Sequence, residues 1–162
     1  MRKLWVVTGL LGLSLAVTAP AAAQARFGAG LSWGSDTDFG LDARLNFGLG
    51  DISKRSPIEG MVTFDYFFPN GFDYWELTGN GLYSIPTKSN NAKPSIGAGL
   101  GIGHTSGYSS PGINGKTNLF LNLVGDLRFK AAQRVLPYVE ARVELGEGSQ
   151  LVLGGGVYFG KP

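Results

Sequence analysis

The stretch "FGLDARLNFGL" (residues 39–49) alternates apolar and other residues along its whole length. Every second residue from Phe39 to Leu49 is apolar, whereas Asp42, Arg44 and Asn46 stand between them. Successive side chains of a β-strand point to opposite faces of the sheet. The stretch therefore predicts a strand with one apolar face and one polar face.

The same alternation recurs along the chain without an intervening helical period, and short segments rich in turn-forming residues separate the repeats. The predicted strands cover residues 27–33, 39–49, 58–68, 75–85, 96–102, 119–129, 139–145 and 151–159. The predicted connections are 34–37, 50–57, 69–71, 86–94, 104–116, 130–134 and 146–149. An even number of antiparallel strands can close into a barrel without a free edge. We therefore predict an all-β, eight-stranded, antiparallel up-and-down barrel.

The N-terminal residues have the pattern of a secretory signal peptide. Arg2 and Lys3 precede an apolar run over residues 4–17, and "AQA" (23–25) supplies small residues at the positions that a signal peptidase reads. The run is shorter than a membrane-spanning helix needs to be. We predict a signal peptide over residues 1–25 and one barrel domain over residues 26–162; a retained anchor is the alternative.

Charge and composition exclude several classes of function. Without Arg2 and Lys3, 12 basic residues remain against 12 acidic ones, so no basic face for nucleic acid is expected. The chain has no cysteine and one histidine, which predicts neither a metal centre nor a bound cofactor. Asp36 and Asp38 could hold a divalent ion that bridges lipopolysaccharide, or simply form a turn.

Two kinds of eight-stranded barrel fit this alternation: a soluble, lipocalin-like barrel with an apolar interior, and a membrane barrel with a polar one. The polar face carries arginine and carboxylates but no lysine, which favours forked ion pairs in a confined lumen over a solvated surface. An excess of carboxylates would suit a narrow pathway for cations or, alternatively, structural ion pairs in a filled interior. The predicted lumen cluster is Asp42, Arg44, Glu59, Asp65, Glu76, Asp126, Arg128, Glu140, Arg142 and Glu144.

Aromatic residues collect near both ends of the predicted strands. Two such belts around an aliphatic band are typical of the two interfaces of a bilayer. One predicted belt holds Trp33, Phe39, Tyr66, Phe68 and Trp75, and the other holds Phe27, Phe47, Tyr83, Phe129 and Phe159.

Four segments resemble the small outer-membrane β-barrel proteins of Gram-negative bacteria, the OmpA-like and opacity-type family. They are "KPSIGAGLGIG" (93–103), "NLVGDLRFK" (122–130), "VLPYVEARVEL" (135–145) and "LVLGGGVYF" (151–159). The resemblance implies a transmembrane barrel in the outer membrane with both termini in the periplasm. It also implies that Phe159 is the terminal aromatic read by the barrel-assembly machinery. The implied partners are that machinery, outer-membrane lipid and lipopolysaccharide, and the barrel is expected to be monomeric.

His104 and Ser106 raise an enzymatic alternative. Outer-membrane lipid A deacylases resemble this arrangement, because they carry a His-x-Ser pair on the outer face of an eight-stranded barrel. That family continues the motif with asparagine, where this chain has Gly107, and places it on a later strand. The other interpretation is an interfacial histidine at the end of a strand. We therefore expect a non-enzymatic barrel with a structural, membrane-integrity role and at most a narrow pore; the alternatives are a lipid A-modifying esterase and a soluble binder.

Overall fold

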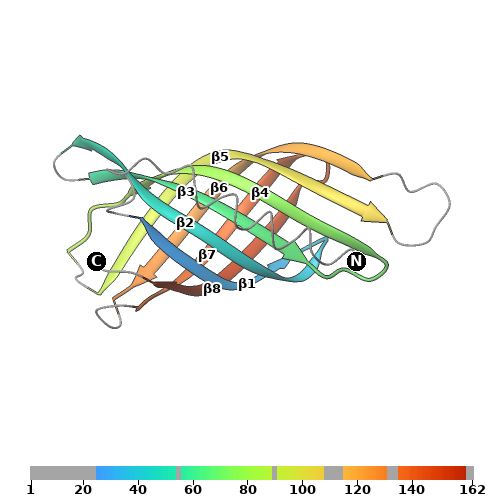
Figure 1. The fold of residues 1–162 in the computed structure, drawn as a ribbon. Coiled ribbons are helices and arrows are strands. Elements are labelled where there is room, and N and C mark those ends of the chain that lie inside the picture. Colours follow the sequence, from blue (N-terminus) through green and yellow to red (C-terminus); the bar gives the residue numbers. More distant parts are fainter. Residues whose placement is uncertain (1–24, 54–55, 89–90, 108–114, 131–134, 160–162) are drawn as a thin grey trace.

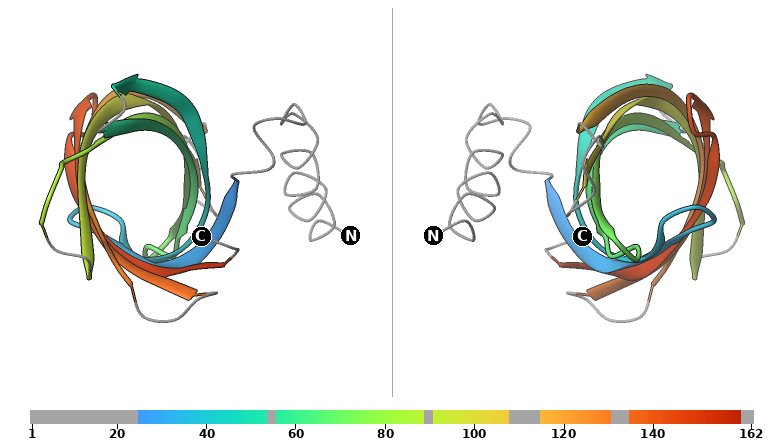
Figure 2. Two further views of the ribbon diagram at one scale, coloured as in Figure 1. Left: turned by 90° about the vertical axis from the view of Figure 1, so that its left-hand side faces the viewer. Right: turned by 90° about the vertical axis from the view of Figure 1, so that its right-hand side faces the viewer.

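The computed structural model is a closed barrel of eight antiparallel strands, in which each strand pairs with its neighbours in the sequence (Figure 1). It describes residues 25–53, 56–88, 91–107, 115–130 and 135–159. The predicted fold is confirmed in strand number, antiparallel pairing and closure, and Figure 2 shows the ring end-on. The strands are β1 (Arg26–Gly34), β2 (Asp38–Ser53), β3 (Ser56–Phe67), β4 (Phe72–Ser84), β5 (Ala92–Gly107), β6 (Lys116–Phe129), β7 (Val135–Gly146) and β8 (Gln150–Phe159).

Closure depends on the pairing of β1 with β8. Their register runs from Phe27 opposite Phe159 to Gly34 opposite Val152. Neither strand is therefore left as an edge that another chain could extend. The predicted signal peptide up to residue 24, the tail 160–162 and the segments 54–55, 89–90, 108–114 and 131–134 lie outside the described residues.

Several strands are longer than the sequence predicts. Residues 50–53, 56–57, 92–94 and 104–107 were expected in connections but belong to β2, β3 and β5. The predicted limits are wrong there because cross-strand pairing outweighs the local preference of polar residues for turns. Thus Lys93 lies opposite Arg128, and His104 lies between Trp75 and Thr117.

Three tight turns connect strands at one end of the barrel. Residues 35–37 join β1 to β2, residues 68–71 join β3 to β4, and residues 147–149 join β7 to β8. Gly71 and Gly148 have φ angles of 90° and 84°, a region in which glycine carries no steric penalty. These glycines allow the chain to reverse within a few residues.

The outer surface of the barrel is apolar. Leu119 is 74% exposed and Phe39 is 68% exposed, and further large apolar side chains cover the other strands. A contiguous apolar surface of this kind is typical of a face that meets lipid. The part of the chain that the structure describes contains no helix that is long and apolar enough to cross a membrane.

Exposed aromatic side chains occupy both ends of this surface, as predicted. At the end with the tight turns, Trp33 lies opposite Phe39. At the other end, Phe27 lies opposite Phe159, and Tyr83 is exposed on β4. The strands between these ends carry mainly aliphatic side chains and glycine on the outside.

Candidate functional site

The interior of the barrel is the candidate site, because the structure places all ten predicted lumen residues there in buried positions. They come from β2, β3, β4, β6 and β7, and none of them stands on the apolar outer face. The lipocalin-like alternative requires an apolar interior, whereas the interior of this barrel holds these charged residues. The ten residues are Asp42, Arg44, Glu59, Asp65, Glu76, Asp126, Arg128, Glu140, Arg142 and Glu144.

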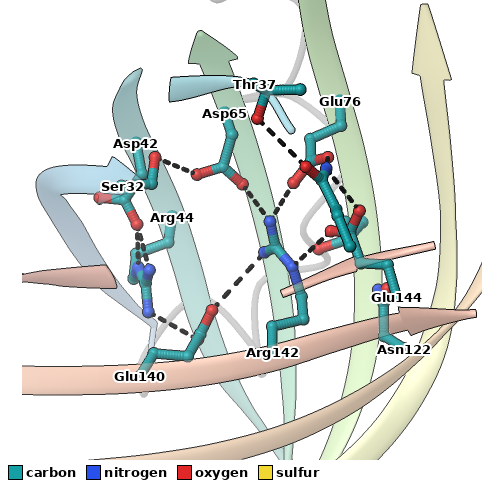
Figure 3. A network of polar contacts seen from close by, with 12 residues as sticks. Ser32, Thr37, Asp42, Arg44, Asp65, Glu76, Asn122, Glu140, Arg142 and Glu144 are labelled. Atoms are coloured by element: carbon teal, nitrogen blue, oxygen red, sulfur yellow. Dashed lines mark hydrogen bonds and ion pairs between the residues drawn. The ribbon is translucent and has the colours of Figure 1, made fainter. Parts of the chain in front are cut away.

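Arg142 on β7 is the centre of the first group of ion pairs (Figure 3). Its Nη2 atom lies 2.9 Å from Asp65 Oδ2 and also contacts Glu76, and its Nε lies 2.9 Å from Glu144 Oε1. Gln150 donates from Nε2 to Glu144 Oε2 at 2.8 Å. A single guanidinium therefore bridges carboxylates on three strands, as its planar fork of donors allows.

Arg44 on β2 organises a second group beside the first. It pairs with Asp42 on its own strand, and its Nη1 atom lies 2.9 Å from Glu140 Oε2 on β7. The Tyr138 hydroxyl donates to Asp42 Oδ1 at 2.7 Å, and the Arg44 guanidinium stacks 3.8 Å from the centre of the Tyr138 ring. Glu140 Oε1 also lies 3.5 Å from Arg142 Nη1, so the two groups form one network.

A third group lies toward the opposite end of the lumen. Arg128 binds Glu59 on β3, with 2.5 Å between Nη1 and Oε2, and binds Asp126 on its own strand at 2.6 Å. Lys93 on β5 also pairs with Glu59. The expectation of a lysine-free polar face is therefore wrong at this position, because β5 begins two residues earlier than the predicted connection ends.

An apolar layer inside the lumen was missed by the sequence analysis. Met61, Leu82 and Val124 pack together in the interior, and the Tyr158 hydroxyl lies 3.7 Å from the sulfur of Met61. The alternation itself could have found them, since each occupies an inward position between two outward ones. This cluster brings apolar groups into an interior that is otherwise polar, and Arg44 Nη1 lies 4.0 Å from the Met61 sulfur.

Inward glycines on β5 give opposing aromatic side chains room. A β-carbon at Gly101 would lie 2.3 Å from the Phe120 ring, and one at Gly103 would lie 2.3 Å from the Tyr74 hydroxyl. Large side chains from β4 and β6 therefore lie directly over the β5 backbone.

His104 and Ser106 lie on β5 at the end with the tight turns. The Nδ1 atom of His104 is hydrogen-bonded to Thr117 Oγ1 at 2.9 Å, and its ring lies 5.5 Å from the Trp75 ring. Ser106 lies opposite Asp73 in the register. The hydrogen bond ties Nδ1 of the imidazole to β6, and the described contacts of His104 include none with the Ser106 hydroxyl that a catalytic pair would need.

No metal site emerges within the described ranges, where no three histidine, cysteine or carboxylate side chains are grouped to hold an ion. Asp36, a predicted candidate, accepts a hydrogen bond from the Ser35 hydroxyl at 3.3 Å. Asp38 begins β2 with a φ angle of 59°, which is compatible with a turn-forming role.

Neither a protein-family model nor a curated protein sequence matches this chain. Solved structures do. The N-terminal β-barrel domain of OprF from Pseudomonas aeruginosa has a TM-score of 0.66 at 13% identity, covering 84% of this chain and 96% of that one. Neisserial surface protein A has a TM-score of 0.56 at 16% identity, covering 83% and 94%.

The chain has the fold of the small outer-membrane β-barrel proteins. The outer membrane enzyme PagL is also similar, with a TM-score of 0.46 at 17% identity over 85% of this chain and 99% of that one. A likeness of that extent does not bear on enzymatic activity. In this outer-membrane-type barrel, the lumen holds seven carboxylates together with three arginines and Lys93.

Proposed function

We propose that this protein is an integral outer-membrane β-barrel with a structural role in the cell envelope, that it is not an enzyme, and that it forms at most a narrow pore. The observation that carries the proposal is the packing of the lumen: ion pairs join non-neighbouring strands, and Met61, Leu82 and Val124 pack together in the interior beside them. An eight-stranded barrel has room for little more than its own side chains. The barrel then acts mainly as a rigid structural element that spans the membrane.

The outer surface supports the membrane location. Exposed aliphatic and aromatic side chains surround the barrel, whereas the buried charged groups lie inside. In water this arrangement would leave a large apolar surface unprotected. The partners that fit it are outer-membrane lipid and lipopolysaccharide, and a monomer satisfies it because closure leaves no strand edge to pair.

Phe159 supports delivery by the barrel-assembly machinery. It is the last residue of β8, it lies opposite both Phe27 and Val135, and its ring is half exposed. A terminal aromatic at this position matches the assembly signal implied by the family resemblance. Export through a signal peptide over residues 1–25 remains part of the same proposal.

Cell fractionation tests the proposal. The protein should be found in the outer-membrane fraction, should require detergent for extraction, and should migrate differently on gels before and after heating. Loss of the protein should make cells more sensitive to detergents, without loss of a measurable enzymatic product. Recovery of a folded protein in buffer without detergent would contradict the proposal.

A further inference from the structure

The outer face of the barrel carries a shallow, open depression over β3, β4, β5 and β6. A groove of about 300 Å³ lies there, lined almost entirely by apolar groups. Its floor is at Gly79, where a β-carbon would have no atom within 4 Å. The residues that form its walls are Val62, Leu77, Leu100, Ile102 and Leu119.

One end of the groove lies next to a row of residues that contains the polar side chains of His104 and Thr117. Leu77, Ile102 and Leu119 lie side by side across β4, β5 and β6. The next outward-facing row toward the tight turns consists of Trp75, His104 and Thr117 in the same order. That row lies about 7 Å farther along the strands, given the rise per residue of a β-strand.

The second row is suited to the level of lipid headgroups. An indole ring is favoured at the boundary between hydrocarbon and water. Thr117 fixes the orientation of His104 through the hydrogen bond to Nδ1, and Trp75 packs against the same imidazole ring.

We propose that this groove is a binding site for a phosphate-bearing membrane lipid: one acyl chain lies over Gly79, and the phosphate lies at His104. The occupant follows from the two ends of the site, because an apolar channel in a lipid-facing surface takes hydrocarbon and the imidazole donates to an anionic oxygen. The inference rests on the proposed function, since the groove must face the bilayer.

Native mass spectrometry of the purified barrel in detergent tests the site. Phosphatidylglycerol and a diacylglycerol with the same acyl chains are compared, because they share the hydrocarbon but only one carries phosphate. The wild-type protein should retain one phosphatidylglycerol in preference to diacylglycerol. Gly79→Leu fills the groove and should weaken that binding about tenfold. His104→Leu should abolish the preference for the phosphate-bearing lipid.

Gly125→Leu is the matched control, because Gly125 also faces outward but lies on β6 between Ile96 and Ala141, beyond the residues that line the groove. Its binding should equal that of the wild type. Equal binding by the Gly79→Leu and Gly125→Leu proteins, or no preference for phosphate in the wild type, would overturn the site. Gels run with and without heating report whether each protein is a folded barrel in vesicles. Failure of the wild type in that assay would contradict the proposed function itself.

Discussion

Arg142 on β7 lies 2.9 Å from Asp65 on β3, so one ion pair joins two strands that face each other across the barrel. In a closed ring of eight strands, the third and the seventh are as far apart as any two can be. The same guanidinium also contacts Glu76 on β4, so the network holds opposite walls at a fixed separation.

Removal of this cation should strongly destabilise the barrel. In an Arg142→Met protein, Asp65, Glu76 and Glu144 would remain buried without their shared partner. Breaking a buried ion pair from one side typically costs about 3–5 kcal/mol. The expected result is a lower free energy of unfolding, measured by urea titration of the barrel in lipid vesicles.

Lys116→Met provides the control for that experiment. Lys116 Nζ lies 2.7 Å from Glu147 Oε2, but both side chains are largely exposed. Exposed pairs contribute little to stability, so the urea midpoint should not change. Equal midpoints for the wild-type, Arg142→Met and Lys116→Met proteins would show that the network does not stabilise the barrel.

The apolar layer should act as the barrier to ions. Leu82→Ser replaces a buried side chain in this layer by a small polar one, which allows water to enter. We expect ion conductance in planar bilayers to rise above that of the wild type. Leu121→Ser, which alters an exposed outer position, should leave it unchanged. A wide, stable pore in the wild-type protein would contradict this account.

The inward and outward glycines should differ in their tolerance of a methyl group. A β-carbon at Gly99 would lie 2.0 Å from the carbonyl oxygen of Gly79, whereas one at Gly79 meets no atom within 4 Å. Gly99→Ala should therefore lower the free energy of unfolding by about 1–3 kcal/mol. Gly79→Ala should be neutral in the same urea titration, and a reversal of that order would refute the packing assigned to β5.

The turn between β7 and β8 offers a pH-dependent signal. The hydrogen bond and charge of Lys116 lower the pKa of Glu147 from its ordinary value of 4.5. The stabilisation from this pair is therefore present above pH 4.5 and is lost as the pH falls through the lowered pKa. NMR titration of the Glu147 carboxyl should show the low midpoint. Lys116→Met should return it toward 4.5; an unchanged midpoint would exclude the pair in solution.

His104 and Ser106 should not be required for any change in the acylation of lipid A. No described hydrogen bond joins His104 to Ser106, so His104→Asn should leave the acylation of lipid A unchanged in cells that produce the protein. Mass spectrometry of extracted lipid A measures this directly. Loss of a deacylated species on substitution would instead support the esterase alternative.

Alternation alone predicted the eight strands and the inward position of residues such as Arg142 and Glu76, because period two assigns every side chain to a face. It did not predict the strand ends, since turn-forming residues near Lys93 are overruled by pairing with β6. Nor could it predict which charges meet. The contact between Arg142 and Asp65 depends on the tilt of strands far apart in sequence, and no local pattern encodes it.

The pairing of Phe27 with Phe159 has a consequence for biosynthesis. The strand that emerges first from the ribosome must wait for the one made last before its backbone donors and acceptors are paired. Until β8 has been made, the apolar strands remain an unclosed sheet with a free edge at β1. Closure of the barrel can therefore be completed only after translation of β8 has ended.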